Sequence, residues 1–310
     1  MAITDEELDQ LPRMLSWDKR LLYQWEGFWY PDVVIKGMLT IQSQFEARSD
    51  DVILASSVKT GTTWLKALSS CIMEAKNTDG EDDKDELLVK NPHARVKTLE
   101  YDKDVDLTST FPSPRLFHTH LPYNALPDSI KKSDCKIVYI ARNPMDTFVS
   151  YWHFFNKIWR TNHQEPVYPL EKAYDEYFCK GVHVYGPFFD HVLQYWLESL
   201  KKPQKILFLK YEELKRDPRG EVKRLASFLG RTFLNEDEVE KVLWRSSLDR
   251  LKNLEVNKNG VVFHSRAPNS SFFRLGVIGD WKNYLTDEMK QGLDEITRIK
   301  FEGSGLHFET

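Results

Sequence analysis

The chain has 310 residues, a formal net charge of -4 and a sequence pI near 6.2. This length is compatible with one large α/β domain or two small ones. Because the chain carries no overall positive charge, a general nucleic-acid binder or a membrane-surface protein is disfavoured.

Signals for export, membrane insertion and metal binding are missing from the sequence. The first ten residues are acidic and lack the basic and apolar regions of a signal peptide. The longest apolar runs are far shorter than the roughly 20 residues that span a bilayer. Cys71, Cys135 and Cys179 have neither CxxC spacing nor close pairing. We therefore expect a cytoplasmic protein without a metal, in which about residues 1–20 are flexible.

The first strong structural signal is an apolar run that ends in a glycine-containing turn. Residues 51–57 predict a buried strand and residues 62–74 predict the helix that follows it. The unpaired N–H groups and the dipole at a helix start form a natural anion site. Lys59 adds a full positive charge to this turn. Hydroxyl donors are added by Thr60, Thr62 and Thr63. The alternative is an ordinary strand-to-helix turn with a surface lysine.

The order of residues in this turn differs from that of the common ATP-binding loop. That loop has a glycine four residues further upstream and ends in Gly-Lys-Ser/Thr. In this chain Lys59 precedes the only glycine of the turn, Gly61. The pattern therefore favours a phosphate site, but not that of a Walker-type ATPase or kinase, which would also need a magnesium-binding carboxylate.

Further strands and helices alternate along the chain. Residues 136–141 and 205–209 predict two more buried strands, and helices are expected after Pro144 and near Arg219. A short apolar approach at residues 115–117 leads to a segment in which proline disfavours a helix. This alternation predicts an α/β fold, a single domain over residues 1–310 with a mostly parallel central sheet flanked by helices. Residues 76–84 are highly charged and predict a solvated loop.

In such sheets the ligand lies beyond the carboxyl ends of the strands. Polar clusters follow each of the predicted strand ends, as this rule requires. Residues 272–282 combine an arginine and two glycines with bulky apolar residues, which indicates a loop whose backbone approaches a ligand closely.

Four motifs occur in order, and together they resemble the soluble, cytosolic sulfotransferases, most of all the plant-type members. The motifs are Lys59-Thr-Gly-Thr-Thr-Trp64, Thr119-His-Leu-Pro122, Arg142-Asn-Pro with Ser150, and Arg274-Leu-Gly276 with Gly279-Asp-Trp-Lys282. The similarity extends from about Trp25 to Leu306. It implies a P-loop-like phosphosulfate-binding loop and transfer of a sulfonate group from 3′-phosphoadenosine 5′-phosphosulfate (PAPS) to the hydroxyl of a small, largely apolar molecule, without a metal.

The resemblance also implies roles for individual residues. It makes His120 the catalytic base and gives Lys59 the role of neutralising the leaving oxygen. The 5′-phosphosulfate contacts would be Lys59, Thr60, Gly61, Thr62 and Thr63. The 3′-phosphate contacts would be Arg142, Ser150, Arg274, Leu275 and Gly276, and the adenine contacts Trp64, Tyr211, Ser246 and Leu248. His118 stands where animal relatives have lysine, and it could steady the transferring sulfonate.

Each candidate also has a structural alternative. Taken alone, His120 could be an interior hydrogen-bonding residue, Arg142 could pair with Asp146 on the surface, and Ser150 could be a filler on its helix. No ligand spacing relates three further histidines, which we expect to be structural: His153, His183 and His191. The ring-rich segments 25–30 and 151–155 are predicted as core rather than as acceptor pocket.

Three positions depart from the family pattern and predict weaker donor binding. Val58 replaces a proline of the phosphosulfate loop, Leu275 replaces a lysine, and Leu248 replaces an aromatic residue. A degenerate member that binds a nucleotide or a small ligand without turnover is therefore an alternative, and a nucleotide-dependent kinase a more distant one. The acceptor stays open among flavonoids, steroids, hydroxyjasmonates and desulfoglucosinolates. Residues 282–287 only partly match the animal dimerisation pattern, so the oligomeric state is open too.

Overall fold

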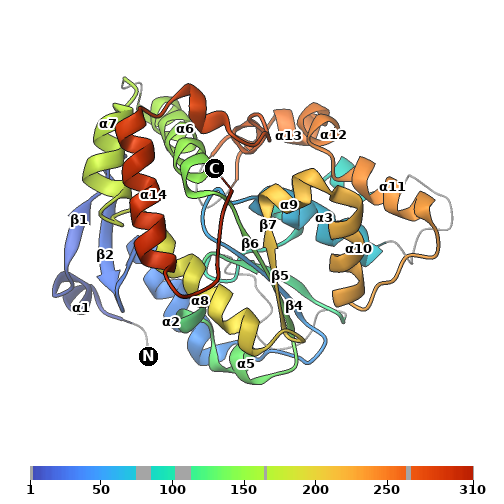
Figure 1. Ribbon diagram of the computed structural model, residues 1–310. Helices are drawn as coiled ribbons and strands as arrows, with labels where there is room; N and C mark the ends of the chain where they lie inside the picture. Colours follow the sequence, from blue (N-terminus) through green and yellow to red (C-terminus); the bar gives the residue numbers. More distant parts are fainter. Residues whose placement is uncertain (1–2, 75–84, 102–112, 164–165, 263–266, 310) are drawn as a thin grey trace.

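The centre of the molecule is a four-stranded parallel sheet with the strand order β5-β4-β6-β7 (Figure 1). The computed structural model describes residues 3–74, 85–101, 113–163, 166–262 and 267–309. The predicted charged loop at residues 76–84 lies outside this part of the chain. The strands are β4 (Val52–Ser56), β5 (Leu116–Thr119), β6 (Lys136–Ala141) and β7 (Ile206–Lys210). The predicted α/β class with a parallel sheet is confirmed.

Successive residues of β4 and β6 enter two different hydrophobic cores. Ile53 and Ile137, which are partners in the register, pack into the core on one face of the sheet. Their neighbours Leu54 and Val138 pack into the core on the other face. Because strand side chains alternate in direction, a sheet covered on both faces requires continuous apolar runs. This requirement explains why these strands could be predicted from the sequence.

Helices cover both faces of the sheet (Figure 1). The helices that contribute most to the first core are α2 (Asp32–Gln44), α6 (Pro144–His163), α8 (Phe188–Lys201) and α14 (Asp287–Phe301). The second core is covered by α3 (Thr62–Glu74), α9 (Tyr211–Arg216), α10 (Pro218–Phe228), α11 (Glu236–Arg245) and α12 (Leu248–Asn253). The short helices are α1 (Asp5–Asp9), α4 (Pro92–Arg95), α5 (Asp128–Lys132), α7 (Leu170–Ala173) and α13 (Glu255–Lys258). Single helical turns are η2 (Glu86–Leu88), η3 (Tyr123–Ala125), η4 (Tyr174–Phe178), η5 (Asn269–Phe272) and η6 (Asp280–Asn283).

A second, antiparallel sheet near the N-terminus was not predicted. It consists of β1 (Arg13–Leu15), β2 (Leu21–Trp25) and β3 (Phe28–Tyr30). The turn between β2 and β3 places Glu26 and Gly27 at φ values of 48° and 85°, as two-residue hairpins prefer. Part of the segment that we expected to be flexible therefore has regular structure, in α1 and β1. The predicted burial of segment 25–30 is confirmed for β3, which is buried throughout.

The parallel arrangement brings the candidate motifs together. All four strands point in the same direction, so their carboxyl ends lie along one edge of the sheet. The loop after β4 leads into α3 at Thr62, and the loop after β6 leads into α6 at Pro144. Both helix starts were predicted.

At the opposite edge of the sheet, a buried ion pair joins the entries into β4 and β5. Arg115 Nε lies 2.8 Å from Asp51 Oδ1, and Arg115 Nη2 lies 2.6 Å from Asp51 Oδ2. Both residues are almost completely buried. Arg115 also donates to the Glu46 carbonyl, and Asp51 accepts from the Arg48 N–H, each at 2.8 Å. The pair therefore ties the loop before β4 to the neighbouring strand.

We predict that Arg115→Met lowers the free energy of unfolding by roughly 3–5 kcal/mol, because the Asp51 carboxylate would stay buried without its counter-charge. The measurement is urea denaturation followed by circular dichroism. Lys132→Met is a matched control, since Lys132 forms an exposed pair with Asp128 and its loss should leave the urea midpoint nearly unchanged. Equal effects of the two substitutions would contradict the structural role of the buried pair.

Candidate functional site

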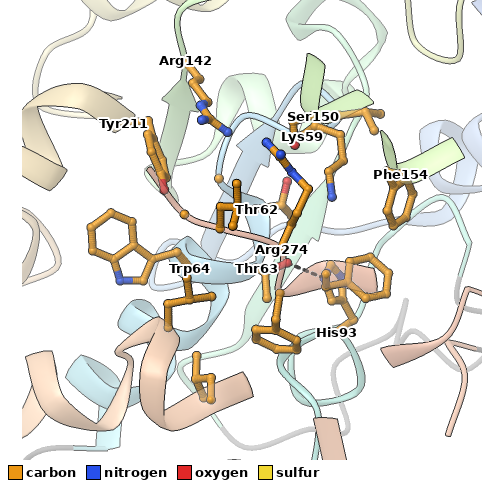
Figure 2. A pocket seen from close by; sticks show the side chains of 18 of the residues that line it. Lys59, Thr62, Thr63, Trp64, His93, Arg142, Ser150, Phe154, Tyr211 and Arg274 are labelled. Atoms are coloured by element: carbon orange, nitrogen blue, oxygen red, sulfur yellow. Dashed lines mark hydrogen bonds between the residues drawn. The ribbon is translucent and has the colours of Figure 1, made fainter. Parts of the chain in front are cut away.

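A cavity of about 560 Å³ lies at the carboxyl edge of the sheet (Figure 2). Its lining includes the predicted phosphosulfate-loop residues apart from Thr60, the predicted base, and both predicted 3′-phosphate and adenine sets. The predicted residues that line it are Lys59, Gly61, Thr62, Thr63, Trp64, His120, Arg142, Ser150, Tyr211, Ser246, Leu248, Arg274, Leu275 and Gly276. The fold thus gathers segments from residue 59 to residue 276 around one space.

The loop between β4 and α3 requires a glycine at position 61. Lys59 and Gly61 have φ values of 72° and 120°, a region that side chains disfavour. A Cβ atom at Gly61 would lie 2.9 Å from Ile140 Cδ1 and 3.0 Å from Tyr211 Cδ2. The loop therefore lies tightly against β6 and the start of α9.

The Thr60 hydroxyl, which we predicted to face the ligand, is turned away from the cavity. It is fully buried and contacts the backbone carbonyls of Ser57 and Ile140, each at 2.9 Å. Its role is therefore to hold the loop against β6. The other two hydroxyls of the loop remain at the cavity: Thr62 contacts Ser56 Oγ at 2.7 Å and Thr63 contacts His93 Nε2 at 2.9 Å (Figure 2).

The Lys59 ammonium lies inside the cavity, where burial and neighbouring cations disfavour its charged form. Its Nζ is 4.0 Å from the centre of the Phe154 ring. Burial lowers the pKa of Lys59 to about 7, and the positive charges of Arg142, Arg274 and Lys157 act in the same direction. A bound anion would reverse this effect, because it favours the charged ammonium.

Arg142 is held in place but keeps an unsatisfied donor. Its guanidinium lies 4.5 Å from the centre of the Tyr211 ring, and Nη2 donates to the Val277 carbonyl at 2.7 Å. Within the described residues, the buried Nε of Arg142 has no hydrogen-bond partner. The pairing with Asp146 that the sequence left open does occur, at 3.4 Å, but it is buried and not on the surface. An unpaired buried donor fits a site for an anion.

Asp146 also fixes the loop of residues 274–281, which adds Arg274 to Lys59 and Arg142 at the cavity. Its carboxylate accepts the N–H groups of Gly279 at 2.8 Å and of Trp281 at 3.1 Å. Arg274 precedes this turn and donates to Asp280 at 2.5 Å. The loop carries Arg274 to the cavity, on the same side as Lys59 and Ser150 (Figure 2).

Flat and aliphatic side chains form the far end of the cavity. The rings of Trp64 and Tyr211 meet edge to face with centroids 5.6 Å apart. Gly276 has a φ of 65°, and a Cβ there would lie 2.6 Å from Leu248 Cδ2, so Leu248 fits against a glycine. The Ser246 hydroxyl lines the cavity but already donates to the Val242 carbonyl at 2.7 Å.

The His120 ring is oriented by its neighbours so that one nitrogen is available. Its Nδ1 lies 2.8 Å from the Ser56 carbonyl, which can only accept, so Nδ1 carries the hydrogen. Nε2 therefore keeps its lone pair. The backbone is fixed as well: the His120 N–H donates to Glu100 at 2.7 Å, and the His120 carbonyl accepts from His191 Nε2 at 2.8 Å. Burial lowers the pKa of His120 to about 3, so the ring is neutral at neutral pH.

His118 does not reach the cavity, so its suggested contact with the sulfonate is wrong for this geometry. It is fully buried, with Nε2 3.0 Å from Ser56 Oγ and Nδ1 3.2 Å from Thr98 Oγ1. Because Ser56 Oγ also contacts Thr62, His118 instead steadies the residue that links the base to the phosphosulfate loop. Ser56 therefore contacts both the His120 ring and Thr62 of the phosphosulfate loop.

Sequence reasoning missed several residues that shape the site. Glu100 holds the His120 N–H and also accepts from Thr119 Oγ1 at 2.9 Å and Tyr185 OH at 3.0 Å. His93 supports Thr63. No spacing or periodicity points to Glu100 or His93, because both follow irregular segments. Ser56, by contrast, ends the strand that was predicted to lead into the site.

The structure shows whether the aromatic residues predicted as core, and the histidines predicted as structural, line the cavity. Phe154 and Phe155 were predicted as core, and they belong to the core but also line the cavity. His183 and His191 lie outside it, consistent with structural roles.

Among the residues that the structure describes, no group of three or more His, Cys, Asp or Glu side chains is placed to hold a metal ion. In the same ranges, no helix combines the length and apolar character that a membrane crossing needs.

We predict that acid destabilises the protein through its buried histidines. Burial lowers the pKa of His120 to about 3 and of His183 and His191 to about 4, whereas an unfolded histidine has a pKa of about 6.5. The unfolded chain therefore binds more protons, and the free energy of unfolding falls as the pH drops below about 6.5, by up to roughly 1.4 kcal/mol per pH unit for each histidine.

Urea denaturation between about pH 7 and pH 5 tests this prediction. His191→Gln should reduce the pH dependence, whereas His307→Gln, a change of an exposed histidine, should not. A pH dependence that is the same in all three proteins would contradict the assignment to buried histidines.

The comparisons with known proteins agree with this geometry. A family model of the sulfotransferase domain matches residues 49–305. The chain is 42% identical over 310 residues to Arabidopsis thaliana cytosolic sulfotransferase 5, with 97% of this chain and 95% of that protein covered.

Two solved structures have the same fold. A crystal structure of a candidate steroid sulphotransferase from Arabidopsis thaliana has a TM-score of 0.75 and 35% identity, covering 100% of this chain and 99% of that one. A mouse sulfotransferase in complex with PAP has a TM-score of 0.72 and 31% identity, covering 91% and 95%. This chain therefore belongs to the sulfotransferase family and is a PAPS-dependent enzyme of the plant type.

Proposed function

We propose that the cavity binds PAPS and that His120 assists direct transfer of its sulfonate group to the hydroxyl of a small, largely apolar acceptor. The observation that carries this proposal is the arrangement inside one cavity: Lys59, Arg142 and Arg274 supply positive charge, and a neutral His120 imidazole with a free Nε2 lies 5.3 Å from the Tyr185 ring. The relative crystallised with PAP supports the donor, and the candidate steroid sulphotransferase supports an apolar acceptor.

The donor would be held at both of its phosphates. Lys59 and the hydroxyls of Thr62 and Thr63 would contact the 5′-phosphosulfate at the start of α3, where backbone N–H groups add to the attraction. Arg142 and Arg274 would hold the 3′-phosphate, with the unpaired Arg142 Nε as one donor. Trp64 and Tyr211 would contact the adenine ring through their flat faces.

In the transfer step, His120 Nε2 accepts the proton of the acceptor hydroxyl while the acceptor oxygen attacks sulfur. One oxygen–sulfur bond forms and the bond from sulfur to the phosphate oxygen breaks. Negative charge accumulates on that oxygen, and the Lys59 ammonium stabilises it. The sulfonate beside the imidazole also favours its protonated form and raises the low pKa of His120. We further infer from the names of the Arabidopsis relatives that the reaction takes place in the cytosol.

The direct test is an assay with sulfur-labelled PAPS and a panel of phenols, flavonoids and steroids, in the presence of EDTA. We expect labelled sulfate esters, and no phosphoryl transfer when ATP and magnesium replace PAPS. Tight PAP binding without transfer to any acceptor would instead support the non-catalytic alternative.

We predict that His120→Ala lowers the single-turnover rate by about 100-fold or more, the usual contribution of a positioned base. Its dissociation constant for PAP, measured by calorimetry, should stay within about twofold, because the anion contacts of the site are unaffected. An alanine variant with the normal transfer rate would contradict the role of His120.

We predict that PAP binding takes up protons at about pH 7.5, because burial lowers the pKa of Lys59 to about 7 and a bound anion raises it. Calorimetry in two buffers of different ionisation enthalpy measures this uptake. Lys59→Met should reduce the uptake by a fraction of a proton per site and weaken binding. Lys215→Met, which removes a lysine at the edge of the same cavity, should leave the uptake as it is; equal uptake in all three proteins would refute the prediction.

A further inference from the structure

The acceptor end of the cavity contains a cation that neither the motifs nor the proposed mechanism uses. Arg20 lines the cavity together with Tyr101, Phe155 and Tyr185. Its side chain is 31% exposed, and its guanidinium carbon lies 5.4 Å from the centre of the Phe155 ring. An arginine among these rings requires an explanation, because an apolar acceptor that covered it would remove its water.

The segment that carries Arg20 is fixed in place. Arg20 closes the turn between β1 and β2, where its carbonyl accepts from the Ser16 N–H at 2.9 Å. The buried Asp18 carboxylate lies 3.0 Å from Arg20 Nη2 and also accepts the Arg20 N–H at 3.3 Å. Asp18 therefore holds one side of the guanidinium, and the group has up to five donors. The donors that Asp18 does not use are left for a ligand.

Arg20 lies on the same aromatic wall as the base. The His120 ring is 5.3 Å from the Tyr185 ring, and the Tyr185 ring is 6.5 Å from the Tyr101 ring. Burial raises the pKa of Tyr101, and the positive charge of Arg20 opposes this shift, so the phenol and the guanidinium are electrostatic neighbours. The wall thus leads from His120 over two tyrosine rings to Arg20.

The charges along the cavity are asymmetric. Among the described residues that line it, the one carboxylate is Asp249, which belongs to α12 beside Leu248 at the adenine end. The lining beside Arg20 includes Tyr101, Phe155 and Tyr185, and Asp18, which pairs with Arg20 at 3.0 Å, does not itself line the cavity. In such surroundings a carboxylate gains two parallel hydrogen bonds from a guanidinium, which a neutral group cannot match.

We propose that the acceptor is a hydroxy acid, with its hydroxyl at His120 and its carboxylate at Arg20. This inference rests on the proposed function and specifies its acceptor. The apolar body of the molecule lies along Tyr185, Tyr101 and Phe155, so the hydroxyl and the acid are at opposite ends of it. Arg20 is a specificity residue in this arrangement and takes no part in the proton transfer.

The experiment compares acids with their methyl esters. Phenols that carry a carboxylate on alkyl chains of increasing length are each paired with the corresponding methyl ester, and kcat/KM is measured with saturating PAPS. At the best chain length, we expect the wild-type protein to prefer the acid by roughly 10-fold or more, in line with a charge-assisted pair. The preference should shrink as the salt concentration rises.

Arg20→Met should reduce this acid-to-ester ratio by roughly 10-fold, mainly through the KM of the acid, and Arg20→Lys should retain part of it. Arg13→Met is the matched control, because Arg13 is an exposed cation of β1 that pairs with Asp9 and does not line the cavity; it should keep the wild-type ratio. If Arg20→Met does not fold, the preference and salt dependence of the wild-type protein still decide the question.

Transfer to neutral phenols with no preference for the acid at any chain length would overturn the role of Arg20 while leaving the sulfotransferase function intact. An acid preference that survives Arg20→Met would also overturn it. Failure to transfer sulfonate to any phenol, acid or ester, would instead contradict the proposed function and this inference with it.

Discussion

Four parallel strands with both faces covered have all of their carboxyl ends at one edge of the sheet, and the rest of the site depends on this constraint. Ser56 ends β4 at this edge. His120 and Arg142 come directly after β5 and β6. Their separation is therefore set by the spacing of hydrogen-bonded strands. The buried pair of Asp51 and Arg115 stabilises the opposite edge of the same strands.

The shared edge concentrates positive charge, and the protein only partly neutralises it. Asp146 and Asp280 accept from the loop of residues 274–281 and pair with the two arginines. Lys59 lies over the Phe154 ring, and its burial together with the positive charges of Arg142, Arg274 and Lys157 lowers its pKa. A cavity of this kind is less stable empty than occupied by an anion. Donor binding and the stability of the loops around it are therefore expected to be linked.

The orientation of the base is set by hydrogen bonds to its ring and to its backbone. The Ser56 carbonyl selects the tautomer of His120, while Glu100 and His191 fix its backbone. Because the Ser56 hydroxyl also contacts Thr62 in the phosphosulfate loop, one residue contacts both the base and the donor site. A change in the loop should therefore affect proton transfer even without touching His120.

The sequence by itself determined the elements whose signals are local. Continuous apolar runs predicted β4, β6 and β7, and residues that follow the first two, Lys59 and Arg142, could be recognised as an anion site from their motifs. Only the tertiary structure decided which side chains face the cavity. Thr60 and His118 turn away from it because a backbone carbonyl and a buried serine hydroxyl satisfy them, and Arg20 enters it from a hairpin that has no motif. Glu100 supports the base from a distant segment of the chain. Contacts of this kind depend on packing between remote segments, and residue spacing along the chain carries no record of them.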